Sequence, residues 1–174
     1  MNAFVWNIIR TNIRSADLVE MDIRSLVIGG AVAARKLVEL VAAMGIDAFQ
    51  SASGTLVEQA LKVLRERIGE IEDGCYRAVA RVEYRDSLLR IPCEMTVAGD
   101  RLLFDFTGAP PQVPHFFNSK AYILRAAIVP RLREVLAPGL PINQALYDVV
   151  EIETRPGTLV DSLSPAPIAA AHMD

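Results

Sequence analysis

The spacing of apolar side chains predicts two long helices in the first part of the chain. Over residues 17–45 the apolar positions recur every three or four residues, and Gly45 suits the helix end because glycine readily adopts positive φ. The same pattern returns over residues 56–71. Residues 48–54 fit either a turn or helix. We therefore expect an antiparallel helical pair over residues 1–74.

Two shorter features accompany this pair. The apolar positions before Asn12 favour a short helix, and Ser15 is a suitable cap for the long helix that follows. Gly29 and Gly30 lie in the middle of that long helix, where each costs about 1 kcal/mol relative to alanine. Either the helix bends there or another backbone approaches closely, and we favour the close approach.

The period changes to two after residue 75, which predicts β-strands. Alternation over residues 76–84, 89–97 and 101–107 predicts a three-stranded antiparallel meander, in which Pro92 indicates an edge or a bulge. Residues 147–154 alternate again and can join the sheet. We expect an antiparallel sheet without parallel βαβ units.

A Gly/Pro loop and a helix follow the third strand. Gly108 and the prolines that follow it exclude both helix and internal strand, after which Asn118 or Ser119 is expected to cap a helix over residues 121–136. Pro130 should kink or split this helix. The predicted fold class is α+β: a helical region, 1–74, and an α+β region, 75–174, with the kinked helix packed on the sheet, in one compact unit.

Composition narrows the possible functions. The chain of 174 residues is 52% apolar, which indicates a folded protein with a sizeable core. Its net charge of −3 provides no basic surface for nucleic acid. Residues 1–14 do not read as a signal peptide, and no apolar stretch is long enough to span a bilayer. We expect a cytoplasmic protein with neither nucleic acid nor membrane as partner.

No residue stands out as a nucleophile or a metal ligand. Cys75 and Cys93 lack CxxC spacing and are interpreted as reduced core thiols, and GxSxG, SxxK and GxxxxGK motifs are absent. His115 could contact a ligand, but stacking or capping within a packed loop is favoured. His172 and Asp174 could belong to a larger ligand set, although a surface or interface histidine is favoured. We assign no catalytic residue and no metal ligand.

Four polar side chains are candidates for binding or for shaping the loop. Asp105 could bind a ligand, but we favour a carboxylate that accepts backbone N–H groups of residues 107–109. The amides of Gln112, Asn118 and Asn143 can pair either with buried backbone or with an amide-bearing substrate.

Several motifs in this order resemble the hydantoinase B/oxoprolinase family. They are NIR at 12–14, AARKLVELVAAMG at 33–45, DGCY at 73–76, DFTG at 105–108, Gln112, Asn118, Pro141-Ile-Asn143, and PGTLVDSLSPAP at 156–167. Asp105, Thr107, Gly108, Gln112 and Asn118 match the family's DFTG, Gln and Asn positions, and Asn143 matches its Pro-x-Asn. The resemblance covers nearly the whole chain but only about a middle third of a typical family subunit.

The resemblance implies a part of an ATP-dependent cyclic amide hydrolase, acting on a hydantoin, 5-oxoproline or a lactam, or of a related ketone carboxylase. Such subunits work with a hydantoinase A-type subunit or domain, in complexes that use ATP, magnesium and a transition metal or zinc. The family's metal ligands precede the matched region, so this chain is expected to bind no cofactor itself and to serve as scaffold and subunit interface. The alternative is a small assembly subunit without catalytic function.

Overall fold

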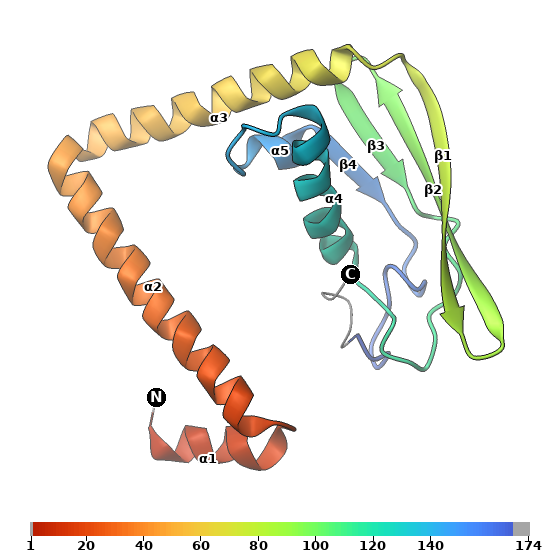
Figure 1. Ribbon diagram of the computed structural model, residues 1–174, viewed down its shortest axis with the longest axis horizontal. Coiled ribbons are helices and arrows are strands. Elements are labelled where there is room, and N and C mark those ends of the chain that lie inside the picture. Colours follow the sequence, from red (N-terminus) through yellow and green to blue (C-terminus); the bar gives the residue numbers. More distant parts are fainter. Residues whose placement is uncertain (1, 169–174) are drawn as a thin grey trace. The chain divides into compact units, whose positions relative to one another are not determined.

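The computed structural model describes residues 2–168 and confirms the predicted α+β class (Figure 1). In chain order the elements are α1 (Ala3–Asn12), α2 (Ala16–Met44), α3 (Ile46–Gly69), β1 (Gly74–Tyr84), β2 (Ser87–Ala98), β3 (Arg101–Asp105), α4 (Ala121–Leu136), α5 (Ala145–Asp148) and β4 (Val150–Glu153). Contacts divide the chain into two compact units, residues 1–53 and residues 54–174, and each is described by itself. None of the described helices is both long and apolar enough to cross a membrane.

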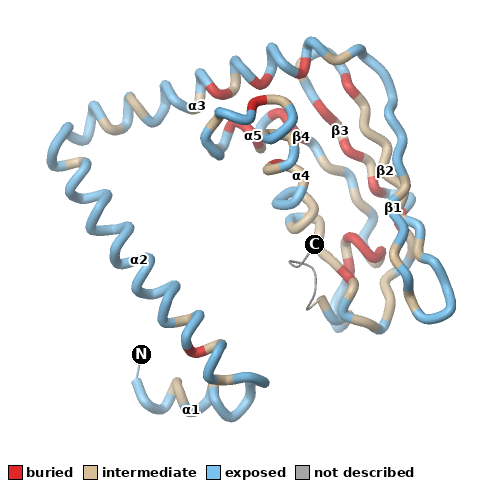
Figure 2. The backbone as a smooth tube through the Cα atoms, in the orientation of Figure 1, coloured by how far each residue is buried: buried red, intermediate tan, exposed pale blue. Residues whose placement is uncertain are grey.

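In the first unit, a buried glutamate joins α1 to α2. The carboxylate of Glu20 accepts hydrogen bonds from Arg10 of α1 at 2.7 Å and from Arg24, one turn further along α2, at 2.7 Å. Glu20 is the one buried residue of α2 (Figure 2). Ser15 precedes α2 without a side-chain cap bond, so its predicted capping role is wrong. Gly45 ends the helix at φ 84°, as predicted.

Helix α3 begins immediately after Gly45, so residues 48–54 are helical and form no turn. Its second half belongs to the core of the second unit, because Ala60, Leu64 and Ile68 are buried together with residues of the sheet. The division between units therefore lies at residues 53 and 54, whereas the sequence placed the boundary at residue 74.

The sheet contains the predicted meander and one parallel strand. Strand β1 pairs antiparallel with β2, and β2 with β3, so that Glu94 lies opposite Asp105. Strand β4 then pairs parallel with β3, with Leu102 opposite Val150. The expectation of an antiparallel sheet without parallel βαβ units is wrong for β4. Helices α4 and α5 carry the chain from the end of β3 back across the sheet and return it in the direction of β3, which makes a parallel βαβ connection.

The core lies between the sheet and the helices of the second unit. Leu102, Phe104 and Phe106 are buried on one face of β3 and its extension, as their alternation predicts. Val129 of α4 joins this core, and α4 runs from residue 121 to residue 136 through Pro130. The residue before α4 is Lys120, so neither Asn118 nor Ser119 caps the helix as expected.

Candidate functional site

The carboxylate of Asp105 shapes the start of the loop after β3. Its Oδ1 accepts a hydrogen bond from the backbone N–H of Thr107 at 2.6 Å, which agrees with the favoured interpretation of this residue. Hydrogen bonding to the side chain and then to the backbone of Thr107 holds the pKa of Asp105 below its usual value. The carboxylate is only half-buried, so water also reaches it.

Gly108 follows where another strand leaves little room for a side chain. A Cβ atom added there would lie 3.0 Å from Cγ of Pro92 on β2. This distance is tighter than nine in ten real Cβ contacts, so the ring of Pro92, which has little freedom, would have to give by a few tenths of an ångström. Glycine is therefore favoured here by close approach and not by a positive φ.

Gln112 connects this loop to a second loop about 50 residues later. Its side-chain Oε1 accepts a hydrogen bond from the backbone N–H of Leu163 at 2.7 Å. The backbone N–H of Gln112 donates to the carbonyl of Gly157 at 2.9 Å. The amide that the sequence offered for a substrate or for backbone is thus engaged with backbone.

Asn118 is fully buried and bonds to two separate stretches of backbone. Its Oδ1 accepts the N–H of Val113 at 2.8 Å, while its Nδ2 donates to the carbonyls of Val113 and His115, each at 2.7 Å. The same Nδ2 donates to the carbonyl of Pro167 at 2.9 Å. Three acceptors share two hydrogens, so every polar atom of this side chain is occupied.

These bonds belong to one structure, which we call the two-loop junction: residues 107–120 together with residues 154–167. Backbone bonds run in both directions between the loops, from Leu159 N–H to the carbonyl of Pro110 at 2.8 Å and from Ser119 N–H to the carbonyl of Leu159 at 2.7 Å. Lys120 adds a bond from its ammonium group to the carbonyl of Ser162. The junction is therefore a network of hydrogen bonds that joins the backbones of two irregular segments.

Sequence reasoning missed two side chains of the junction. Thr158 and Ser162 are buried, and their hydroxyls donate to the carbonyls of Arg155 at 2.6 Å and Ser119 at 3.0 Å. Both lie within the PGTLVDSLSPAP segment, which contributes to the family resemblance but predicts no role for these two side chains. Small polar residues among apolar ones between prolines were the available signal.

His115 packs in an aromatic cluster beside the junction. Its ring centroid lies 4.0 Å from that of Phe116, 4.4 Å from that of Phe117 and 5.7 Å from that of Tyr84. Stacking within a packed loop is the interpretation that the sequence favoured. Its buried Nδ1 and the buried hydroxyl of Tyr84 lack a hydrogen-bond partner within the described part of the chain.

Asn143 is not brought together with the other candidates. Its Oδ1 accepts the N–H of Ala145 at 3.0 Å, a local bond that opens helix α5. Asp105, Thr107, Gly108, Gln112 and Asn118 all lie in or next to the two-loop junction, whereas Asn143 stabilises a separate turn.

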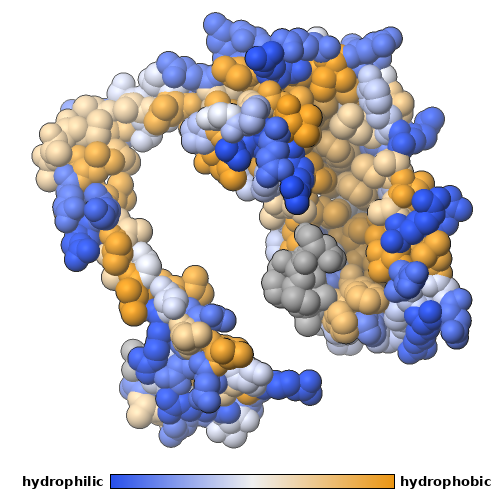
Figure 3. All heavy atoms as spheres, viewed as in Figure 1, coloured by the Kyte–Doolittle hydropathy of each residue, from blue (hydrophilic) through white to orange (hydrophobic). Residues whose placement is uncertain are grey.

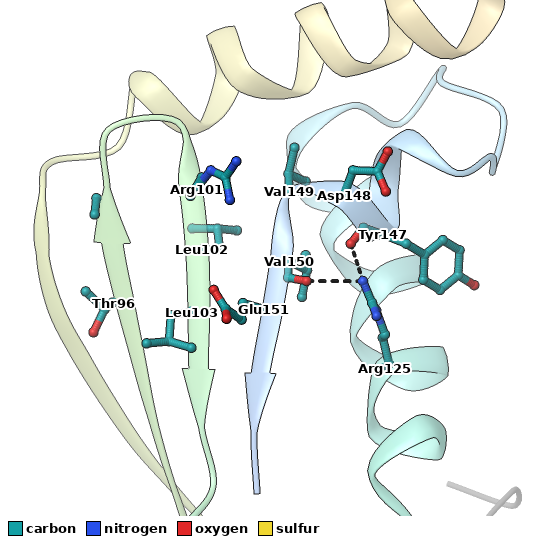
Figure 4. Close-up of a pocket in the computed structure, with 11 residues that line it drawn as sticks. Thr96, Arg101, Leu102, Leu103, Arg125, Tyr147, Asp148, Val149, Val150 and Glu151 are labelled. Atoms are coloured by element: carbon teal, nitrogen blue, oxygen red, sulfur yellow. Dashed lines mark hydrogen bonds between the residues drawn. The ribbon is translucent and has the colours of Figure 1, made fainter. Parts of the chain in front are cut away.

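A pocket of about 440 Å³ lies elsewhere, between β2, β3, β4 and the helices α4 and α5 (Figure 4). Arg125 reaches into it and donates to the carbonyl oxygens of Tyr147 and, at 3.4 Å, Val150, with its guanidinium 5.6 Å from the ring of Tyr147. Arg101 and Glu151 also line it. None of the sequence-predicted site residues lines this pocket, and no motif pointed to it.

The described residues do not provide a complete donor set for the metal that the resemblance implies. Within residues 2–168, no three His, Cys, Asp or Glu side chains come together. His172 and Asp174, the pair considered from the sequence, lie outside the described residues.

Known proteins resemble this chain over most of its length. The putative D-/L-hydantoinase B-type subunit of Pseudomonas sp. (strain NS671) is 31% identical over 97% of this chain and 31% of its own length. The caprolactamase beta subunit of Pseudomonas jessenii is 29% identical over 94% of this chain and 29% of its own length. The chain thus spans about a third of the length of these relatives.

Two solved structures share the fold. The crystal structure of the ATP-dependent caprolactamase from Pseudomonas jessenii matches with a TM-score of 0.75 and 26% identity, covering 90% of this chain and 27% of that one. The nucleotide-free structure of acetone carboxylase, described with a mechanism of ATP-dependent acetone carboxylation, gives a TM-score of 0.69 at 26% identity, over 79% of this chain and 20% of that one. The family model for hydantoinase B/oxoprolinase matches residues 1–174, and the chain therefore belongs to the hydantoinase B/oxoprolinase family.

Proposed function

We propose that this chain is a scaffold and subunit-interface part of a B-type subunit in an ATP-dependent complex that hydrolyses cyclic amides or carboxylates ketones. The relatives named for hydantoinase and caprolactamase, and the fold shared with acetone carboxylase, support this class of reaction. A hydantoinase A-type subunit is the proposed partner, and the ATP, magnesium and metal chemistry is proposed to lie elsewhere in the complex.

The observation that carries the scaffold role is how the candidate polar side chains are used. Asp105, Gln112, Asn118 and Asn143 each bond to backbone groups of this chain, and Asn118 has no polar atom left for a ligand. A side chain that binds substrate must offer a free donor or acceptor, which Asn118 does not. Asp105, Gln112 and Asn143 each hold a backbone N–H with one side-chain oxygen, which supports a role in the architecture of the subunit.

In the test, this chain replaces the aligned part of the caprolactamase beta subunit. The resulting hybrid, which we call the exchange protein, is then assembled into the caprolactamase. ATP-dependent caprolactam hydrolysis by this complex is expected, while a complex that lacks the aligned part is expected to be inactive. The isolated chain, supplied with ATP, magnesium and zinc, should not hydrolyse hydantoin, 5-oxoproline or caprolactam. With bicarbonate added, it should not carboxylate acetone.

Two results would overturn the proposal. Turnover of any of these substrates by the isolated chain would show that it carries reactive groups of its own. A folded exchange protein that cannot enter the caprolactamase complex would contradict the interface role.

A further inference from the structure

Helix α2 contains a segment that is apolar on every side, residues 25–34, which we call the apolar segment. These ten residues carry no charge, and all of them are exposed (Figure 2). Leu26 is 76% exposed, Val27 61% and Ile28 63%. Successive residues of a helix point about 100° apart, so these three side chains face three different directions. The hydrophobic surface along α2 is visible in Figure 3.

Such a segment is typical of a helix surrounded by protein. An amphipathic helix covers one face and leaves a polar face to water, whereas a helix that is hydrophobic all round is normally buried. Ser25, at its first position, is the only polar residue of the apolar segment, so the segment has no polar face to leave in water. It therefore requires cover on more than one side.

The glycines at the centre of the segment indicate how closely the cover approaches. Beyond the backbone of its own helix turn, a Cβ atom added at Gly29 or at Gly30 would meet no atom of the described residues within 4 Å. Both are helical positions, where glycine weakens the helix without any benefit from local geometry. Ala31, Ala33 and Ala34 extend this small-residue surface, which allows another backbone to come near.

The known relatives indicate what provides the cover. They match this chain over about a third of their length, so two thirds of each of them lies outside the match. A ten-residue uncharged segment is about half of what a bilayer span requires. We propose that the apolar segment of α2 is a docking surface for the polypeptide that family subunits carry outside the matched third. This proposal rests on the proposed function.

The experiment measures whether the segment is covered, by the rate at which a maleimide modifies a cysteine placed there. Val27→Cys is made in the isolated chain and in the exchange protein, and each rate is divided by the rate of the same thiol in urea. Peptide mass spectrometry follows the native Cys75 and Cys93 separately. Lys62→Cys, whose parent side chain is 78% exposed on α3, is the control variant.

The expected result is fast modification of Val27→Cys in the isolated chain and at least about tenfold slower modification in the exchange protein, where only locally opened molecules react. Lys62→Cys should react fast in both. Equal rates at position 27 in both proteins would overturn the proposal. If the exchange protein does not fold, the comparison uses the intact caprolactamase beta subunit, with the cysteine at the position aligned with Val27, and the same two outcomes decide.

Two results from the isolated chain alone would also overturn it. Modification that slows as the chain concentration rises would mean that a second copy covers the segment. Slow modification at every concentration would mean that the chain covers its own helix. An active exchange complex in which Val27→Cys reacts fast would refute the docking surface and leave the proposed function standing. An inactive complex in which Val27→Cys is protected would refute the proposed function and leave the docking surface standing.

Discussion

The side-chain amide of Asn118 donates a hydrogen bond to the carbonyl oxygen of Pro167, 49 residues further along the chain, at 2.9 Å. Because Asn118 is fully buried and also bonds to Val113 and His115, one side chain fixes both halves of the two-loop junction. Loops normally satisfy their backbone with water. Here a single buried amide replaces that water.

Asn118→Ala should therefore destabilise the chain strongly. The substitution removes the partner of backbone groups on Val113, His115 and Pro167, and each of these that water cannot reach costs about 1–3 kcal/mol. Asn143→Ala is the matched control, because it removes one local bond that opens α5 and should cost about 1 kcal/mol. Urea unfolding followed by circular dichroism measures both. Equal losses for the two variants would contradict the central position of Asn118.

Gly108→Ala should destabilise the second unit by steric overlap. The new methyl group would lie 3.0 Å from Cγ of Pro92, and overpacking of this kind costs about 1–3 kcal/mol. Gly139→Ala adds the same methyl group where, apart from the adjacent residues, no atom of residues 2–168 lies within 4 Å. The control should be neutral or slightly more stable, since alanine restricts the unfolded chain. Thermal melts in which Gly108→Ala matches Gly139→Ala would refute the close contact.

The sequence predicts strand β3 and its buried face better than it predicts the contacts between the two loops. The alternation through Leu102, Phe104 and Phe106 predicted both the strand and its buried face, because a half-buried strand imposes period two on its side chains. The hydrogen bond from Thr107 to Asp105 was also predicted, since it spans two residues and depends on local geometry alone.

The role of Asn118 was not predictable in the same way. An asparagine before a helix is most often a cap. Asn118 instead joins two loops, and it can do so only because the chain brings the carbonyl of Pro167 next to it. The direction of β4 has the same explanation: its residues suit either orientation, and the crossover through α4 and α5 decides. In both cases the deciding partner lies far away in the sequence.

Asp105→Asn should make stability less dependent on pH in acid. Because the folded-state pKa of Asp105 is lowered, the carboxylate contributes stability above the unfolded-state pKa, and that stability is lost as the pH falls through the folded-state pKa. Solvent reaches this half-exposed group, so the contribution should be below about 1 kcal/mol. Asp86→Asn, in the exposed turn between β1 and β2, is the control. Urea titrations between pH 2 and pH 7 that show no difference between the two variants would exclude a role for the charge of Asp105.

The second half of α3 should be required for the sheet to fold. Ala60, Leu64 and Ile68 are buried in the core that also contains Val97 and Leu102, so a chain that begins after this helix exposes that apolar surface to water. Within the full chain, Leu64→Ala should cost about 2–5 kcal/mol, because it removes a fully buried side chain and leaves a cavity.

Truncation gives the sharper measurement of the same relationship. A chain of residues 54–174 should unfold cooperatively in a thermal melt, since it contains the whole of the second unit. A chain of residues 75–174, cut at the boundary that the sequence indicated, should lose that cooperative transition. The control for Leu64→Ala is Val38→Ala in the full chain. Val38 is 68% exposed on α2, so shortening this side chain should change stability by less than about 0.5 kcal/mol. If residues 75–174 melt as cooperatively as residues 54–174, α3 is no part of this core, and the domain boundary belongs at residue 74.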